Sequence, residues 1–193
     1  SGVKANILST LTSTIISTMI AAQMSIEECV STIMETLPIC SVRGVAYSTF
    51  TIIKITNNTY AEIIQYDNPQ VILLRGGKSF DYETETRVIA GKQILESKIE
   101  LEQDDAFIAM SDGTIFAGVG ETLNYGWQRE NIVEYAEANY DVKMSAAAIS
   151  AMIVDACNDL YNHKPGDDTT AATVRVRKRS FVNLMFGPPR NPE

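Results

Sequence analysis

The pattern of apolar and polar residues predicts helices at both ends of this chain and strands between them. Residues 4–23 are expected to form a first helix, because apolar residues recur there at three- and four-residue steps. The residues at this spacing are Leu8, Leu11, Ile15 and Met19, with Ile16 and Ile20 beside them. They share one face of the helix, so we expect that face to pack against a core.

A second helix is predicted over residues 26–37. Ser25 and Glu28 have the spacing of a capping box, and Pro38 ends the pattern. After this helix, β-branched and aromatic residues dominate. The strands expected there are 46–55, 60–66 and 71–74 as an antiparallel meander with a turn at Asn57-Asn58, and then 80–82, 86–89, 94–101 and 106–110.

Helical patterns return near the C-terminus. They cover residues 128–139 and 146–160, with Ser145 as the cap of the latter, and a last strand follows over 168–176. Helices at both ends of a set of antiparallel strands indicate an α+β layered fold, in which helices cover the outer faces of the sheets. The length of 193 residues is enough for one core, so residues 1–193 are predicted to be a single domain, with 187–193 as a tail or the start of a linker.

Composition narrows the class of function. A net charge of −8 argues against nucleic-acid binding, which depends on clustered Lys and Arg. The one basic run, Arg175, Arg177, Lys178 and Arg179, is interpreted as the solvated face of an edge strand. Three cysteines without metal-ligand spacing indicate a reducing, cytoplasmic environment. The uncharged stretch 5–26 is long enough to span a membrane, but it is rich in Ser and Thr, so no membrane insertion is expected.

Two acidic clusters carry the candidate chemistry. Ser111-Asp112-Gly113 follows the apolar strand 106–110, and Gly166-Asp167-Asp168-Thr169-Thr170 precedes the apolar strand 171–174. Carboxylates at the ends of neighbouring buried strands can present oxygen ligands to a hard divalent cation, which points to a metal-assisted hydrolase. Each cluster taken alone is also a common turn sequence. His163 is the only histidine, which argues against imidazole-centred chemistry. The sequence has no Walker-type loop, which argues against nucleotide binding.

These motifs resemble a known family. Ser111-Asp112-Gly113 after a strand, the helix start at Gly126–Ile132 and Gly166-Asp167-Asp168-Thr169-Thr170 before a last strand are similar to metal-dependent serine/threonine phosphatases of the protein phosphatase 2C (PPM) class. The most similar branch is the bacterial one typified by stage II sporulation protein E. The resemblance implies a four-layer α-β-β-α sandwich of antiparallel sheets.

The resemblance also implies roles for site residues. Asp112 and Asp167 would bind the same Mn²⁺ or Mg²⁺ ion, and Asp168 would orient its loop or add a ligand. Gly113 and Gly166 would support the loops. A metal-activated water would hydrolyse phosphoserine or phosphothreonine on a regulatory partner protein. The alternative is a non-catalytic pseudophosphatase that binds such a partner.

The family's first Asp-Gly metal motif would lie just before Ser1. The chain is therefore expected to be N-terminally incomplete, to lack the first strands, to be weakly active or inactive alone, and to self-associate through an exposed sheet edge. Other residues carry further expectations. The acidic stretch Glu100, Glu102, Asp104 and Asp105 should be a solvated strand edge and turn. Trp127 should be a core anchor, and the resemblance implies that the segment around it, 118–137, lies beside the site and gates it. Sheet packing is expected for the aromatic residues of the strands, which are Tyr47, Phe50, Tyr60, Tyr66, Phe107 and Phe116.

Overall fold

The computed structural model describes residues 2–36, 49–164 and 166–177, and within them the chain forms two compact units. Unit 1 contains the residues up to Thr56, Tyr60–Asn68 and Tyr82–Ile99, and unit 2 contains Asn57–Thr59, Pro69–Asp81 and the residues from Glu100 onward. Expectations for the side chain of Leu8, for Pro38, Cys40, Tyr47, Lys178 and Arg179, and for the tail at 187–193 lie outside what the structure describes.

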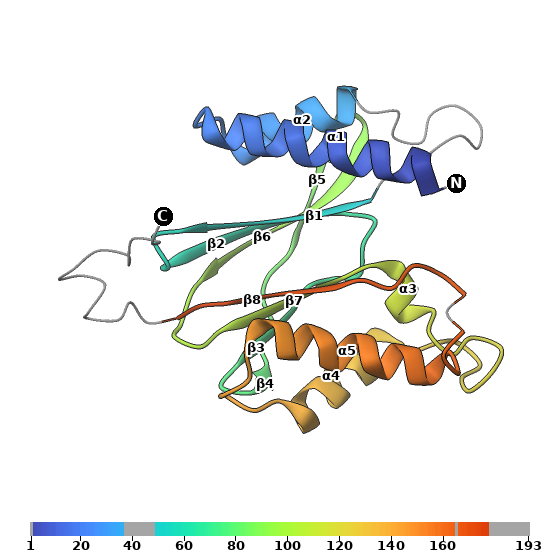
Figure 1. Ribbon diagram of the computed structural model, residues 1–193. Coiled ribbons are helices and arrows are strands. Elements are labelled where there is room, and N and C mark those ends of the chain that lie inside the picture. Colours follow the sequence, from blue (N-terminus) through green and yellow to red (C-terminus); the bar gives the residue numbers. More distant parts are fainter. Residues whose placement is uncertain (1, 37–48, 165, 178–193) are drawn as a thin grey trace, which may run out of the picture. The chain divides into compact units, whose positions relative to one another are not determined.

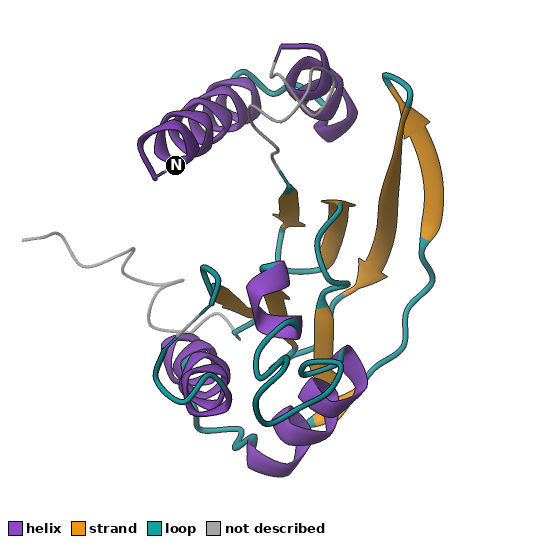
Figure 2. Cartoon of the chain, turned by 90° about the vertical axis from the view of Figure 1, so that its right-hand side faces the viewer, coloured by secondary structure: helices purple, strands orange, loops and turns teal. Residues whose placement is uncertain are grey.

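Unit 1 combines two helices with a four-stranded sheet. The helices are α1 (Gly2–Ala21) and α2 (Ile26–Thr36), which lie against each other (Figures 1 and 2). The strands are β1 (Phe50–Thr56), β2 (Tyr60–Tyr66), β5 (Glu85–Ile89) and β6 (Lys92–Glu100), in the order β1-β2-β6-β5. The apolar core between these elements is formed by Ile26, Val30, Ile33, Met34, Phe50, Ile52, Ile64 and Ile94.

The capping box of α2 is confirmed. The Ser25 amide donates to the Glu28 carboxylate at 2.8 Å, and the Glu28 amide donates to the Ser25 hydroxyl at 3.2 Å. These contacts satisfy two backbone donors that a helix N-terminus leaves unpaired. The bond from the Ser25 amide is also the main reason that the pKa of Glu28 lies below its ordinary value.

Helix α1 differs in part from the expectation. Ile15 and Ile16 pack against the core of unit 1, but Leu11 is 43% exposed and Thr12 is buried instead. Ser and Thr residues are so numerous between the apolar residues of α1 that apolar spacing alone does not predict which face is buried. None of the described helices is both long and apolar enough to cross a membrane.

Unit 2 holds a second four-stranded sheet and three helices. Its strands are β3 (Ile72–Arg75), β4 (Lys78–Ser79), β7 (Ala106–Met110) and β8 (Ala171–Arg175), in the order β4-β3-β7-β8 with antiparallel pairing. Its helices are α3 (Asp112–Ile115), α4 (Arg129–Asn139) and α5 (Ala146–Leu160). Helix α5 lies along β8, and α3 sits at one end of β7 and β8 (Figure 1). Helices and strands in both units confirm the α+β class.

Most predicted elements form close to their expected bounds, but two strand predictions were wrong. The turn at Asn57-Asn58 joins β1 to β2 with φ of 53° and 55°, as expected for a tight hairpin. The predicted meander ends there, because β3 pairs with β4 and β7 in the other sheet. No strand forms at 80–82, and the strand of this region is β4 at Lys78–Ser79. The Phe80 ring packs under the Arg75 guanidinium, with Arg75 Cζ 4.1 Å from the ring centroid.

Two charged residues expected in solvent are buried. Asp105 is fully buried, and its two carboxylate oxygens accept hydrogen bonds from Arg75 at 2.9 and 2.8 Å. The Arg175 side chain is 6% exposed and donates to the backbone oxygens of Val142 and Met144 in the loop between α4 and α5. Partners far away in the sequence therefore determine the burial of Asp105 and Arg175, which the charges of neighbouring residues do not predict.

Aromatic residues follow the expectation with one exception. Trp127 is buried in the core of unit 2 and meets the Tyr135 ring edge-on, with centroids 5.3 Å apart, so its role as a core anchor is confirmed. Phe107 is fully buried, as expected for β7. Phe116 is 50% exposed, because the chain leaves the sheet at Ser111 and forms α3.

Removal of the Asp105 carboxylate should destabilise unit 2 strongly. Asp105→Ala leaves the Arg75 guanidinium without its bidentate partner, and breaking a buried pair in this way costs about 3–5 kcal/mol of unfolding free energy. Lys54→Ala is the control, because the Lys54–Glu62 pair is half-exposed at 3.6 Å and should be worth less than about 1 kcal/mol. Urea unfolding of both variants measures the difference, and equal losses would contradict the assignment.

Stability should also fall in alkaline solution because of Cys157. Burial raises the pKa of this thiol to about 12 from an ordinary value of 9.0. Between these two values the unfolded chain has lost the proton while the folded chain keeps it. The unfolding free energy should therefore decline by about 1.4 kcal/mol per pH unit above about pH 9 from this group.

The measurement is the difference in unfolding free energy between the parent chain and Cys157→Ala under reducing conditions. Other groups titrate equally in both proteins, so only the thiol contributes to the change of this difference with pH. A difference that stays constant across the alkaline range would contradict the burial of a protonated thiol.

Candidate metal centre

The register of β7 and β8 brings the two acidic clusters to one end of the sheet. Met110, the last residue of β7, is opposite Ala171, the first residue of β8. The end of β7 and the start of β8 therefore lie at the same end of the sheet. The pairing continues for one step, because the Ser111 amide donates to the Thr170 carbonyl at 3.0 Å. The turn that starts at Ser111 and the loop 166–170 are consequently neighbours, although they are far apart in the sequence.

The Ser111 hydroxyl joins the two segments directly. It accepts a hydrogen bond from the Thr170 amide at 2.9 Å and donates one to the Asp168 carbonyl at 3.1 Å. Ser111 is also the N-cap residue of α3, yet its side chain makes no capping bond to that helix. Its hydrogen bonds go to the acidic loop instead, a link that sequence reasoning, which treated Ser111 as a turn residue, did not find.

Gly113 allows the two segments to approach closely. A Cβ atom at this position would lie 2.5 Å from the Asp168 carbonyl oxygen, which is too short for any side chain. Gly166 is different, since a Cβ there would meet only Tyr161 Cε1 at 3.8 Å, an ordinary contact. A steric need for glycine is thus present at Gly113 and absent at Gly166.

The carboxylates of Asp112 and Asp167 are exposed and similarly held. Oδ1 of Asp112 accepts from the Gly113 amide at 2.9 Å, and Oδ1 of Asp167 accepts from the Asp168 amide at 2.8 Å. Neither carboxylate forms an ion pair with any residue in the described ranges. The other oxygen of each is available to a ligand.

Tyr161 lies beneath both acidic segments. This residue follows α5, is 8% exposed, and donates its hydroxyl to the Gly113 carbonyl at 2.8 Å. Burial raises the pKa of Tyr161, and the negative charges of Asp167 and Asp112 raise it further. Both carboxylates are therefore close enough to act on one phenol, which keeps its proton and remains a donor. No local signal identifies this residue, because the bond spans 48 positions.

The chemistry of these residues fits a hard divalent cation held partly by water. Mg²⁺-type sites often use only one or two carboxylates and retain several waters, and this end of the sheet offers two. The Thr169 hydroxyl of the same loop is buried without a hydrogen-bond partner in the described part of the chain, so it can still bind a water or an ion-bound group. The described residues contain no group of three or more His, Cys, Asp or Glu side chains that could hold a metal.

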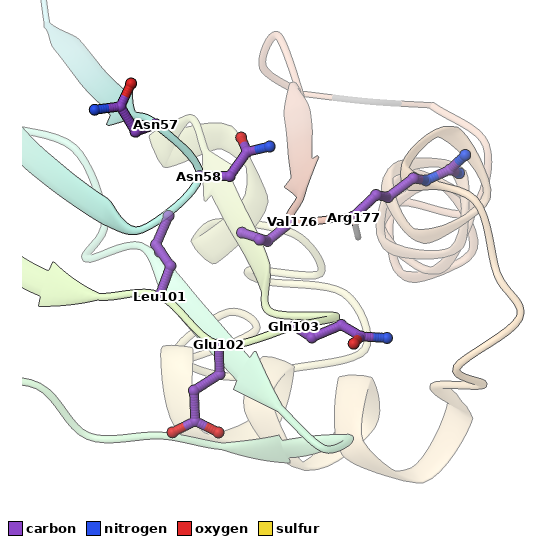
Figure 3. A pocket seen from close by; sticks show the side chains of 7 residues that line it. All are labelled: Asn57, Asn58, Leu101, Glu102, Gln103, Val176 and Arg177. Atoms are coloured by element: carbon purple, nitrogen blue, oxygen red, sulfur yellow. The ribbon is translucent and has the colours of Figure 1, made fainter. Parts of the chain in front are cut away.

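Two further positions to consider are His163 and a surface pocket. His163 is exposed, with φ of 57° and its Nε2 atom 3.7 Å from Asp159. A pocket of about 280 Å³ lies at the opposite end of β7 and β8, lined by the turn 57–58 and residues 101–103 and 176–177. Figure 3 shows that its polar side chains spread in different directions and do not converge on one point.

Comparison with solved structures defines the class of this fold. It matches the phosphatase domain of SpoIIE from Bacillus subtilis in a crystal form without domain swapping, with a TM-score of 0.67, 17% identity, and 93% of this chain and 77% of that chain covered. The same domain presoaked with Mn matches with a TM-score of 0.59, 15% identity and coverages of 90% and 74%. The fold is therefore that of a PPM-class, protein phosphatase 2C-like domain.

The family follows from the sequence. Residues 1–177 match the model of the stage II sporulation protein E (SpoIIE) family, so the chain belongs to that family. No curated protein sequence matches it significantly. The expected resemblance is thereby confirmed, while the metal-binding roles of Asp112, Asp167 and Asp168 stay predictions.

Gly113→Ala should disturb the contact between the acidic segments. The added methyl group would overlap the Asp168 carbonyl, so the backbone must move, and we expect a loss of about 1–3 kcal/mol of unfolding free energy. Gly166→Ala is the matched control in the same loop and should change the free energy by less than about 0.5 kcal/mol. Chemical unfolding compares the two, and a tolerated Gly113→Ala would show that the segments are not in close contact.

Proposed function

We propose that this chain is a metal-dependent phosphatase module that hydrolyses phosphoserine or phosphothreonine on a regulatory partner protein. Membership of the SpoIIE family and the PPM-class fold support the reaction class. The observation on which the proposal depends is the position of the segments that carry Asp112 and Asp167 at one end of paired strands, where Ser111 bonds to Asp168 and Thr170.

In this proposal Asp112 and Asp167 hold Mn²⁺ or Mg²⁺, and Asp168 supports the loop through its backbone. A divalent cation in such a centre supplies an activated water and neutralises phosphoryl charge. The residues of the chain orient the centre: Gly113 permits the close approach, and the exposed carboxylate oxygens leave room for a phosphorylated side chain from a partner.

Two carboxylates give one cation few protein ligands, and a two-ion mechanism needs more. We therefore propose that hydrolysis by this chain alone is weak. The absence of a third ligand group in the described residues also supports the second candidate, a non-catalytic module that binds a phosphorylated partner.

The surroundings of the reaction are also part of the proposal. We place the protein in the cytoplasm because Cys29 and Cys157 are buried free thiols in the structure. We place self-association through a sheet edge at β5, which ends the order of its sheet and carries Val88 with 71% exposure.

Asp112→Asn and Asp167→Asn should each lower Mn²⁺-dependent hydrolysis of an aryl phosphate by about 100-fold or more, because each removes a charged ligand of the cation. Asp155→Asn is the matched control, since Asp155 is an exposed carboxylate on α5 that belongs to neither acidic segment, and it should keep the parent rate. Steady-state rates at saturating Mn²⁺ provide the test.

Retention of the parent rate by both site variants would refute the assignment of these ligands. If the parent chain binds Mn²⁺ and a phosphopeptide but gives no turnover, the non-catalytic function is the correct one. The same purified proteins serve for the rate and binding measurements.

A further inference from the structure

Two hydroxyl groups form hydrogen bonds to the backbone of the acidic segments. Ser111 bonds to the amide of Thr170 and the carbonyl of Asp168, and Tyr161 bonds to the carbonyl of Gly113. We propose that Ser111 and Tyr161 are positioning residues of the metal centre, which fix the spacing of Asp112 and Asp167 and thereby set the affinity for the cation. This inference rests on the proposed function and extends it to residues that touch neither metal nor substrate.

The Ser111 hydroxyl bonds to the loop 166–170 and not to the helix that Ser111 caps. A serine at an N-cap ordinarily accepts a hydrogen bond from an amide in the first turn of the helix. Ser111 makes no such bond and instead uses its hydroxyl both as donor and as acceptor toward residues 57 and 59 positions away. Since Asp168 follows Asp167 directly, this contact limits where the Asp167 carboxylate can lie.

Tyr161 fixes the other segment in the same way. Its ring is buried and its hydroxyl reaches the Gly113 carbonyl at 2.8 Å, one peptide unit from Asp112. The ring also lies beside the other acidic segment, since a Cβ atom at Gly166 would come within 3.8 Å of Tyr161 Cε1. Ser111 therefore ties the two segments to each other, and Tyr161 ties one of them to the end of α5.

If Ser111 and Tyr161 only stabilised the fold, other hydroxyl groups of unit 2 would affect Mn²⁺ affinity equally. The chain offers two such hydroxyl groups as controls. Ser150 of α5 and Thr173 of β8 form a hydroxyl–hydroxyl bond of 2.9 Å on the same sheet, toward its middle. That bond joins α5 to β8, whereas the Tyr161 bond joins the end of α5 to α3, and neither Ser150 nor Thr173 belongs to an acidic segment. Tyr135 is a second control, since its ring packs on Trp127 and its hydroxyl makes no hydrogen bond with the described residues.

The test measures Mn²⁺ affinity directly, from the electron paramagnetic resonance signal of free Mn²⁺ in titrations of the whole chain. Ser111→Ala and Tyr161→Phe should each raise the Kd by about 10–100-fold, the usual effect of residues that orient metal ligands. Ser111→Thr keeps the hydroxyl and should restore most of the affinity. Ser150→Ala and Tyr135→Phe should leave the Kd within about twofold of the parent value, while thermal unfolding of all variants reports stability separately.

The outcomes separate this inference from the proposed function. If the parent chain binds no Mn²⁺, both are overturned. If the parent binds Mn²⁺ and Asp112→Asn abolishes binding, but Ser111→Ala and Tyr161→Phe bind like the parent, only the positioning role is overturned. An equal loss of affinity in Ser150→Ala would also overturn it, because the effect would then follow general stability. Should Ser111→Ala fail to fold, Tyr161→Phe and Ser111→Thr decide.

Discussion

The pairing of β7 with β8 in a single register is the constraint on which the candidate centre depends. Met110 opposite Ala171 places the Ser111 amide on the Thr170 carbonyl, and every other contact between the acidic segments follows from that position. A slip of one residue would turn each side chain to the opposite face of the sheet. Full burial of Phe107 and Ile108 in β7 makes such a slip costly, so the hydrophobic core sets the geometry of the polar end.

An aspartate lies at each end of β7, and the two differ in burial and in hydrogen-bond partners. Asp105, just before the strand, is buried and has both oxygens bonded to Arg75. Asp112, just after it, is exposed and forms no ion pair with the described residues. The first carboxylate is neutralised by the protein, whereas the second has no cationic partner in the described ranges. The metal role proposed for Asp112 depends on this difference.

What could be predicted from sequence is what depends on neighbours in the chain. The capping box of Ser25 and Glu28, the cap at Ser145 and the Asn57-Asn58 turn are local, and all three form as expected. The pairing of β3 in a different sheet, the burial of Arg175 and the bond from Tyr161 to Gly113 depend on residues tens of positions away, for which a single sequence has no signal. The acidic positions were found because strand ends are visible in the pattern, while the residues that hold them were not.

A centre with few ligands depends more on the arrangement of those ligands than a centre with many. Each carboxylate that moves freely must lose conformational freedom when a cation binds, and that cost subtracts from affinity. With three or four ligands the sum of contacts can outweigh it, but two carboxylates have little surplus. In the proposed centre, close contact at Gly113 and the hydroxyls of Ser111 and Tyr161 would reduce this cost before binding, because they hold the backbone of the two acidic segments. On that proposal, weak ligation by two carboxylates and a firmly held backbone go together.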